Sequence, residues 1–379
     1  MAGGAGVGRI VILGASGQAG GALAALLAPG LAPDLELVLV GRDPGRLAAA
    51  RDRVDAAAGR AVAAVARHDL TDLDETRRAV AGARLVVVAA SLPERTGALA
   101  RATLAAGADW FDLMLSSRRK LDALAALAPE IHARGCCFVT DGGFHPGLPA
   151  AMARWAAMRL GRLRRADIHA GMRIDWRAER LADSTLAEAV EEFARCDLTA
   201  WVGGRLRRLR LRDLPVIDFA PPIGRRACTP MPLDEMRALV AAMPGLETAG
   251  FYVGGFNPVT DWVAFPLLMA LARIPALRRQ TIALTRLVLA RCAGAPPPHW
   301  LELRLIAEGE GGTAAMTVGG EDPYRMTAAP AVACLRRLLD GTLRRPGLIH
   351  QGMQVDPAVF FDDLAGLGLT VGRSGGAPA

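Results

Sequence analysis

The chain has 379 residues, 52% of them hydrophobic, and a formal net charge of +7. This length suffices for two domains with buried cores, and this composition excludes an intrinsically disordered chain. Lys120 is the only lysine, so the positive charge is carried by arginines, and no nucleic-acid-reading motif accompanies it. We therefore expect no nucleic-acid partner.

The six cysteines form no C-x-x-C pair and have no ligand-like spacing with histidine, so we expect reduced thiols and no metal site. The N-terminus lacks the basic start and apolar core of a signal peptide, and no apolar run free of charge or proline reaches ~18 residues. The sequence thus predicts a soluble, cytoplasmic protein without an integral membrane segment. Attachment to a membrane surface through the apolar, arginine-flanked helices of 261–291 is an alternative.

A glycine-rich turn follows the first predicted strand, 9–13, and precedes a predicted helix, 21–28. The spacing G-x-x-G-x-x-G is typical of a dinucleotide-binding turn, in which the backbone approaches a pyrophosphate and N–H groups at the helix start bind it. The predicted contacts are the seven residues of the turn: Gly14, Ala15, Ser16, Gly17, Gln18, Ala19 and Gly20.

The second predicted strand, 35–40, ends at Gly41 and Arg42, before a helix over 44–58. An acidic residue at this point would bind the ribose hydroxyls of NAD, whereas the planar fork of an arginine suits the 2′-phosphate of NADP. The sequence therefore predicts NADP as cofactor, with NAD less favoured and Arg46 as a helper. The alternative is a solvated arginine at a strand end.

Two more strands, 61–66 and 84–90, contribute further candidates where they end. Asp69 and Leu70 follow the third strand, and Asp69 is predicted to bind adenine, with capping of a helix over 72–81 as the alternative. The fourth strand is a valine run typical of a strand buried on both faces. Its small terminal residues leave room for the nicotinamide ribose: Ala89, Ala90 and Ser91.

Strands over 109–113 and 136–141 complete a set of six that alternate with helices, including one over 118–133. This alternation predicts an α/β fold with an N-terminal Rossmann doubly wound parallel sheet of order 3-2-1-4-5-6, in which the strand 9–13 is central. Its ligand crevice lies beyond the carboxyl ends of the strands, from which all these candidates come.

From about residue 150 the pattern changes to alternating strands (166–174 and 205–212) and a hairpin of 300–307 with 313–318. We expect a second α+β domain on a mixed sheet. The predicted division is a Rossmann domain at 1–145, an α+β substrate and dimerisation domain at 146–325, helices returning to the Rossmann domain at 326–372, and a disordered tail at 373–379.

With these motifs, the Ala-Ala-Ser-Leu-Pro segment at 89–93 and the Phe-His-Pro-Gly-Leu-Pro segment at 144–149, the chain resembles the saccharopine dehydrogenase (saccharopine reductase-like) family. The segment Trp-Phe-Asp-Leu at 110–113 is similar to the aromatic–Asp–Leu segment of that family. The resemblance implies an NADP-dependent oxidoreductase acting on a small molecule, with a second domain that carries substrate contacts and a homodimer interface. Well-studied relatives reduce an imine to a secondary amine. The second domain departs from those relatives, so the acceptor stays open among C=N, C=O and C=C compounds.

Hydride transfer needs a group that manages a proton, and two residues are candidates. His145 lies on the turn after the sixth strand, where an imidazole could titrate near neutral pH; its alternative role is to order a hinge. Asp112, at the end of the fifth strand, could orient ribose or substrate, or cap the next helix. Asp141 is a weaker candidate.

Substrate contacts and rival classes complete the predictions. Four residues of the second domain could contact an acidic substrate or be plain exposed surface: Arg173, Asp175, Trp176 and Arg177. Ser116 stands where a Tyr-x-x-x-Lys pair ending at Lys120 would need tyrosine, which excludes the short-chain dehydrogenase chemistry. A regulator or scaffold that binds NADP without catalysis is the alternative function.

Overall fold

The computed structural model describes residues 8–178, 181, 183–257 and 259–375, which form two compact units. The first unit contains the chain up to Leu148 and the segment Thr327–Asp356. The second contains Pro149–Met326 and the chain from Pro357 onward. The chain therefore crosses between the units three times, and each unit is described by itself below.

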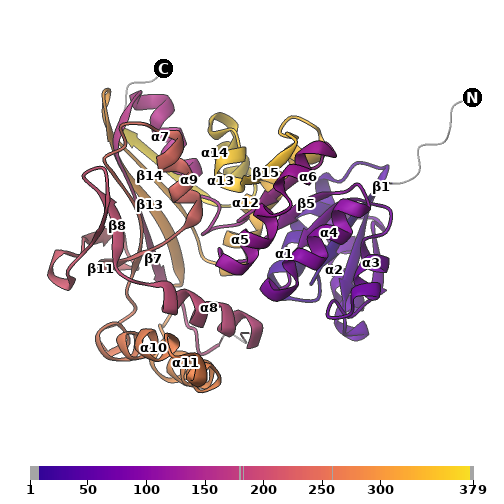
Figure 1. Cartoon of the computed structure of the whole chain (residues 1–379), viewed down its shortest axis with the longest axis horizontal. Helices are drawn as coiled ribbons and strands as arrows, with labels where there is room; N and C mark the ends of the chain where they lie inside the picture. The colour runs from indigo at the N-terminus through magenta and orange to yellow at the C-terminus, as the bar shows by residue number, and fades with distance from the viewer. Residues whose placement is uncertain (1–7, 179–180, 182, 258, 376–379) are drawn as a thin grey trace, which may run out of the picture. The chain divides into compact units, whose positions relative to one another are not determined.

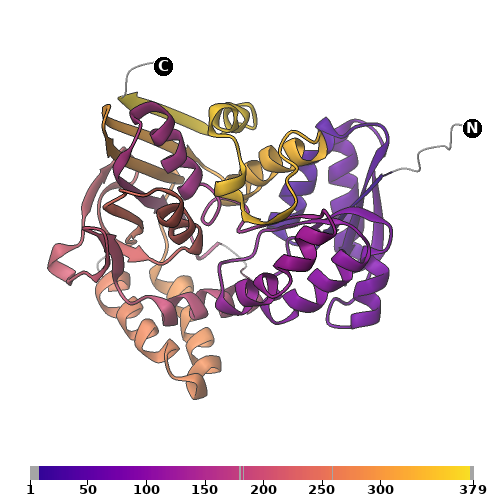
Figure 2. The same ribbon diagram turned by 45° about the horizontal axis from the view of Figure 1, so that its top comes forward.

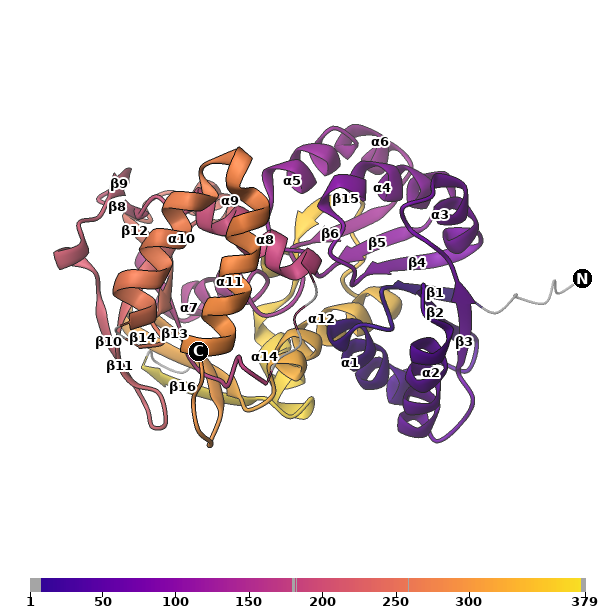
Figure 3. The ribbon, with the colours of Figure 1, turned by 90° about the horizontal axis from the view of Figure 1, so that it is seen from below.

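A seven-stranded sheet forms the centre of the first unit, in the order β15-β6-β5-β4-β1-β2-β3 (Figure 3). Every neighbouring pair is parallel. The predicted order is confirmed, with β1 central, and β15 is an addition that the sequence analysis did not predict. The strands are β1 (Gly8–Leu13), β2 (Leu35–Gly41), β3 (Ala63–Arg67), β4 (Ala83–Val88), β5 (Asp109–Asp112), β6 (Cys137–Thr140) and β15 (Gly347–His350).

Helices cover both faces of this sheet, as a doubly wound fold requires. Helices α3 to α6 lie on one face and α1, α2 and most of α12 on the other (Figure 3). The helix predicted over 118–133 is two helices, and Pro129 lies in the first turn of the second one, a position that proline favours. The helices are α1 (Gln18–Leu27), α2 (Pro44–Ala58), α3 (Leu73–Val80), α4 (Thr96–Ala105), α5 (Arg118–Ala125), α6 (Ala128–Ala133), α12 (Pro323–Leu339) and α13 (Gln351–Gln354), with short 3-10 turns at Ala28–Gly30 and Pro93–Arg95.

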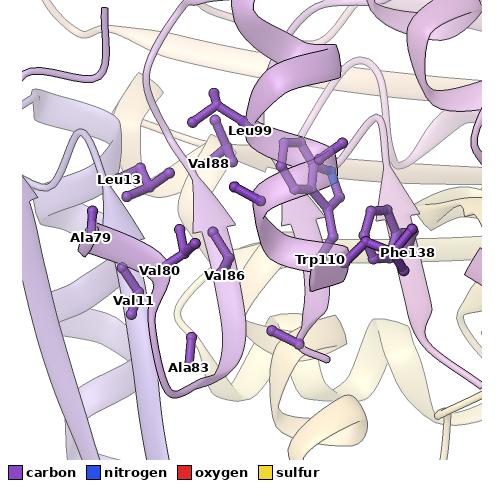
Figure 4. Close-up of a cluster of buried hydrophobic side chains, with 14 of the residues drawn as sticks. Val11, Leu13, Ala79, Val80, Ala83, Val86, Val88, Leu99, Trp110 and Phe138 are labelled. Atoms are coloured by element: carbon purple, nitrogen blue, oxygen red, sulfur yellow. The ribbon is translucent and has the colours of Figure 1, made fainter. Parts of the chain in front are cut away.

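The core between the sheet and α3 to α6 is made mostly of aliphatic side chains, with two aromatic ones (Figure 4). Val86 and Val88 of β4 are fully buried, as the valine run predicts for a strand covered on both faces. Trp110 of β5 stacks on Phe138 of β6 with ring centroids 5.7 Å apart. This packing fixes the ends of β4, β5 and β6, from which the candidate site residues emerge.

The second unit contains a nine-stranded mixed sheet, in which β7 and β12 pair in parallel and the other described pairs are antiparallel. The predicted mixed sheet is confirmed, and β13 and β14 form the predicted hairpin. Helices α7 (Pro149–Leu160) and α9 (Asp234–Ala242) pack on this sheet (Figure 1). The strands are β7 (Leu163–Arg173), β8 (Thr199–Val202), β9 (Leu206–Arg208), β10 (Val216–Phe219), β11 (Gly224–Met231), β12 (Thr248–Gly254), β13 (Trp300–Gly309), β14 (Gly312–Gly320) and β16 (Thr370–Gly375).

The structure differs from the expected division near the C-terminus. Helix α14 (Pro357–Gly366) does not return to the first unit; it packs on α7 and β16. Residues 373–375, expected in a disordered tail, belong to β16, which pairs with β14 and so covers a sheet edge that would otherwise be open. Residues 376–379 lie outside the described residues. The strand expected over 205–212 is shortened to β9 and followed by a 3-10 turn at Leu211–Asp213.

Three helices of the second unit contact one another away from its sheet: α8 (Asp183–Arg195), α10 (Phe265–Ala272) and α11 (Arg278–Cys292), the latter two orange in Figure 2. A π-helical turn, Thr260–Ala264, precedes α10, and a 3-10 turn, Pro275–Leu277, precedes α11. Within the described ranges, no single helix has the length and apolarity to cross a membrane. In the same ranges, one pair of consecutive stretches, Thr260–Ala272 and Pro275–Cys292, is long and apolar enough when the two are taken together. The two stretches are bent by 116° relative to each other.

His169, in the middle of β7, is a buried polar residue with an unusual environment. Its side chain is 1% exposed and stacks on Tyr252 of β12, with ring centroids 4.9 Å apart. Neither ring nitrogen has a hydrogen-bond partner among the described residues. Burial, assisted by the charges of Arg165 and Arg304, lowers the pKa of His169 to about 4. The folded protein therefore holds this imidazole in its neutral form.

We expect His169→Phe to make the protein more tolerant of acid. The pKa of His169 is lower in the folded than in the unfolded chain, so the unfolded chain takes up the proton first as the pH falls. Wild-type stability should thus decline between about pH 6.5 and 4, by roughly 3 kcal/mol at 1.36 kcal/mol per pKa unit. Phenylalanine keeps the stacking and removes this loss. Urea unfolding at pH 7.5 and pH 4 measures the free energy of unfolding of both proteins. An equal loss of stability between the two pH values in the wild-type protein and in His169→Phe would contradict the expectation.

Candidate cofactor-binding and active site

The glycine turn between β1 and α1 closes tightly against the end of β4. Gly14 has a φ of +88°, and a Cβ atom on it would lie 2.8 Å from the backbone nitrogen of Ala90. A Cβ atom on Gly20 would lie 2.5 Å from the carbonyl oxygen of Gly14. No side chain is therefore tolerated at either position without displacement of backbone. The turn brings bare backbone to the carboxyl edge of the sheet, as a close-approaching pyrophosphate requires.

Helix α1 begins at this turn without a side-chain cap. Its N-cap residue, Gly17, has no side chain to accept a hydrogen bond, and in this described segment no acidic residue stands in the first turn. The first N–H groups of a helix have no acceptor within the helix, so those of Gln18 and Ala19 can bind an anion. The predicted phosphate contacts are thus brought together, and the turn fits a dinucleotide.

The end of β2 places two arginines beside the turn. Arg42 is exposed and directly precedes Asp43, which caps α2 by accepting from Arg46 N at 3.0 Å. The Arg46 guanidinium donates to Ser16 O at 2.8 Å, so it joins the second strand end to the glycine turn. Gly41 packs closely against the turn, because a Cβ atom on it would lie 2.8 Å from Ser16 Oγ and would displace that hydroxyl. The tip of β2 therefore offers an exposed guanidinium that fits a 2′-phosphate.

Asp69 forms a local turn after β3 and does not cap a helix. Its Oδ1 accepts from Thr71 N at 3.0 Å and from Thr71 Oγ1 at 2.8 Å, and these bonds, with Arg42 and Arg95 nearby, lower its pKa. The cap of α3 is Asp72, which corrects the alternative role considered for Asp69. Leu70 is buried in the core cluster, so only its backbone is available to a ligand.

The end of β4 provides a polar atom that lacks a partner. Ala89 N donates to Leu13 O at 2.8 Å, which joins this strand end to the glycine turn. The hydroxyl of Ser91 is buried and has no hydrogen-bond partner in the described part of the chain. A buried hydroxyl without a partner is costly, so its presence suggests a missing ligand group. Ala89, Ala90 and Ser91 therefore fit the ribose expected at this strand end.

A buried ionic cluster joins the ends of β5 and β6. Lys120 of α5 is fully buried, and its Nζ donates to Asp112 Oδ1 at 2.9 Å, Asp141 Oδ1 at 2.5 Å and Met114 O at 2.8 Å. All three protons of the ammonium thus have acceptors. Burial alone would lower the pKa of Lys120, but the two carboxylates outweigh it and raise the pKa. Lys120 is therefore a charged ammonium in contact with both carboxylates.

Each carboxylate has a further donor. Asp112 Oδ2 accepts from Trp110 Nε1 at 2.9 Å, and Asp141 Oδ2 accepts from Ser116 Oγ at 2.6 Å. Burial would raise the pKa of Asp141, but Lys120 and a histidine beside it outweigh burial and lower that pKa. Asp112 is 0% exposed and does not cap a helix, since Ser117 caps α5. As a predicted site residue it is thus placed inside the cluster, away from solvent.

The histidine beside Asp141 is His350, which the sequence analysis missed together with β15. His350 Nδ1 lies 2.9 Å from Asp141 Oδ2, and its side chain is 20% exposed. The next residue, Gln351, is fully buried and clamps the turn after β6. It accepts from Gly143 N at 3.1 Å and donates to Gly143 O at 3.2 Å. A four-residue strand about 200 positions away leaves no periodic signal that sequence reasoning could use.

His145 lies on this clamped turn, as predicted, but does not titrate near neutral pH. Burial lowers the pKa of His145 to about 4. Its ring lies against Phe144, with centroids 4.7 Å apart, and its peptide bond to Pro146 is cis. The expected neutral titration is therefore corrected. At pH 7 the imidazole is therefore uncharged. It can form hydrogen bonds, but it cannot act as a general acid.

The remaining candidates belong to the second unit. Asp175 accepts from Arg177 Nε at 2.8 Å in an exposed pair of the second unit, and Arg173 donates to Pro296 O at 3.2 Å. Trp176 packs edge-on against Phe256, with centroids 6.3 Å apart. Among the described residues, no group of three or more His, Cys, Asp and Glu side chains could hold a metal ion.

Solved structures share this fold. The apo saccharopine dehydrogenase (L-Glu forming) of Saccharomyces cerevisiae matches with a TM-score of 0.61 and 13% identity, covering 97% of this chain and 100% of that one. The biliverdin reductase of Synechocystis sp. PCC 6803 matches with a TM-score of 0.43 and 16% identity, covering 94% and 96%. No family model and no curated protein matches the sequence. The resemblance drawn from the sequence is thus confirmed for the fold, which is all that identities this low establish.

We expect Lys120→Met to destabilise the protein by about 3–5 kcal/mol, the usual cost of removing one partner from a buried ionic cluster. Methionine fills similar space but leaves two buried carboxylates without their cation. The matched control is Arg118→Met, on the exposed side of the same helix. Urea unfolding at pH 7 measures both variants, and losses of equal size would show that the cluster contributes no more than a surface charge.

Proposed function

We propose that this chain, which has the fold of saccharopine dehydrogenase, is an NADP-dependent oxidoreductase that reduces an imine or a related C=N, C=O or C=C acceptor. One observation carries the proposal. At the carboxyl edge of the first sheet, glycines that tolerate no Cβ atom, an uncapped helix start and an exposed arginine at the tip of β2 converge. This is the combination that a pyrophosphate and a 2′-phosphate require.

Different residues of the first unit bind different parts of the cofactor. The backbone of the turn from Gly14 to Gly20 holds the pyrophosphate, and Gly41 lets the adenosine half pass close to β2. Arg42, assisted by Arg46, binds the 2′-phosphate, which favours NADP over NAD. Asp69 and Leu70 border the adenine. On the other half, Ala89, Ala90 and Ser91 border the nicotinamide ribose, where the unpartnered hydroxyl of Ser91 gains a hydrogen bond.

The bound nicotinamide supplies a hydride, and the protein holds the acceptor and manages a proton. His145, neutral at pH 7, is proposed to orient the acceptor by hydrogen bonding. Asp112 is proposed to act through Lys120, by fixing the ends of β5 and β6, rather than by touching the acceptor. The acceptor is a small molecule, and the homodimer implied by the resemblance is measurable by light scattering.

A binding protein without catalysis is the alternative, and the two functions differ in one assay. Both bind NADPH, but only the oxidoreductase oxidises it when an acceptor is present. A panel of cyclic imines, α-keto acids with amines, aldehydes and enones, followed by NADPH absorbance at 340 nm, is expected to identify an acceptor. Tight NADPH binding with no oxidation across the panel would favour the binding protein.

We expect Arg42→Ala to weaken NADPH binding by about 1.5–3 kcal/mol, the range for a hydrogen bond to a charged group, and to leave NADH binding nearly unchanged. The guanidinium has a partner in the 2′-phosphate only, which NADH lacks. Calorimetric titration with both nucleotides measures this. Arg77→Ala, an exposed arginine of α3 paired with Asp74, is the matched control. Equal losses for both nucleotides would show that Arg42 does not read the 2′-phosphate.

A further inference from the structure

His350 ends β15 at the same edge of the sheet as the proposed cofactor site. It stands opposite Thr140, the last residue of β6, in parallel register. In the sheet, β15 is next to β6, and β6 is next to β5. Neighbouring strands are about 4.8 Å apart, so the backbone of His350 lies close to the ends of both strands. In a doubly wound sheet the half of the crevice over these strands holds the second nucleoside of a dinucleotide. His350 is thus at the nicotinamide half of the site.

Asp141 fixes the orientation of this imidazole. The His350 Nδ1 to Asp141 Oδ2 distance is 2.9 Å, and an ionised carboxylate accepts only, so Nδ1 carries a proton. The second ring nitrogen, Nε2, is then the one that gains and loses a proton. Asp141 in turn cannot move, because Lys120 and Ser116 bond to it as well.

His350 lies beside a buried cluster in which one ammonium is shared by two carboxylates. Lys120 Nζ is 2.9 Å from Asp112 Oδ1 and 2.5 Å from Asp141 Oδ1. His350 is a second basic side chain in contact with Asp141, with Nδ1 2.9 Å from Asp141 Oδ2. Its side chain is 20% exposed, which gives a ring proton a route to solvent.

The backbone at Asp141 is strained where it supports His350. Asp141 has a φ of +57°, a left-handed conformation that non-glycine residues seldom adopt. Such a residue persists only where its surroundings determine it, and such residues concentrate at functional sites. Here the left-handed turn follows the last residue of β6, and the carboxylate is held by Lys120, Ser116 and His350 together.

We propose, on the basis of the proposed function, that His350 is the acid–base residue of the nicotinamide half-site and that Asp141 is its positioning residue. In the reductive direction a hydride adds to the acceptor carbon, and the imidazolium gives a proton to the acceptor nitrogen or oxygen. A C=N bond becomes CH–NH, and a C=O bond becomes CH–OH. The neutral imidazole then regains a proton from water, and oxidation reverses each step.

The proposal is tested by NMR on the whole protein with 13C-labelled histidine, which gives six ring signals in the 379-residue chain. His350→Gln identifies the signal of His350 by its loss. Added NADP⁺ is expected to shift this signal, because the nicotinamide lies beside the ring. Added 2′-phospho-ADP-ribose, which lacks only the nicotinamide, is expected to leave it in place. An equal shift with both ligands, or no shift with either despite saturation by NADP⁺, would overturn the proposal.

A second measurement separates this proposal from the proposed function. Calorimetry is expected to show unchanged NADPH affinity in His350→Gln, with turnover of an acceptor reduced by about 10²–10⁴-fold and KM little changed. His132→Gln, an exposed histidine of α6, is the matched control and should turn over normally. Unchanged turnover in His350→Gln would overturn the role of His350 alone. Failure of the wild-type protein to bind NADP⁺ would overturn the proposed function as well.

Discussion

The arrangement of the candidate site depends on one buried ammonium group. Lys120 neutralises charge between Asp112 and Asp141, which stand at the ends of neighbouring strands, and it also binds Met114 O. Two buried carboxylates side by side would repel each other and would prefer to be protonated. The ammonium therefore allows β5, α5 and β6 to meet at this edge with charged groups inside. Arginines carry the other basic charges of this chain, and none could replace Lys120 without a wider space.

The two halves of the proposed cofactor site are built on different principles. The adenosine and pyrophosphate half consists of bare backbone at Gly14, Gly17 and Gly20, with the charge supplied by an exposed guanidinium. The nicotinamide half is built from side chains that are buried, charged and mutually bonded. Its outer strand, β15, and the helix α13 that follows it hold the turn after β6, through His350 on Asp141 and Gln351 on Gly143. Phosphates are recognised by backbone N–H groups, whereas proton management requires titratable side chains.

The sequence predicted the features that arise from local pattern. The glycine spacing at 14–20, the valine run of β4 and the alternation of strands with helices each leave a signature within about 15 residues. The order of six strands followed from them by general rules of topology. Tertiary contacts between distant segments leave no such signature. His350 contacts Asp141, which lies 209 residues earlier in the chain. The strand β15 has four residues, all partly buried, so its sequence shows no alternation of apolar and polar residues. The neutral state of His145 is likewise caused by its burial, which the neighbouring residues in the sequence do not predict.

The central claim is that the carboxyl edge of the first sheet binds NADP. A crystal structure of the full chain with NADP⁺ bound tests it most directly. We expect the pyrophosphate on the N–H groups at the start of α1, the 2′-phosphate on Arg42, and the nicotinamide over the ends of β4 to β6 within reach of His350. A cofactor bound elsewhere, or a glycine turn that remains empty at saturating NADP⁺, would contradict the account.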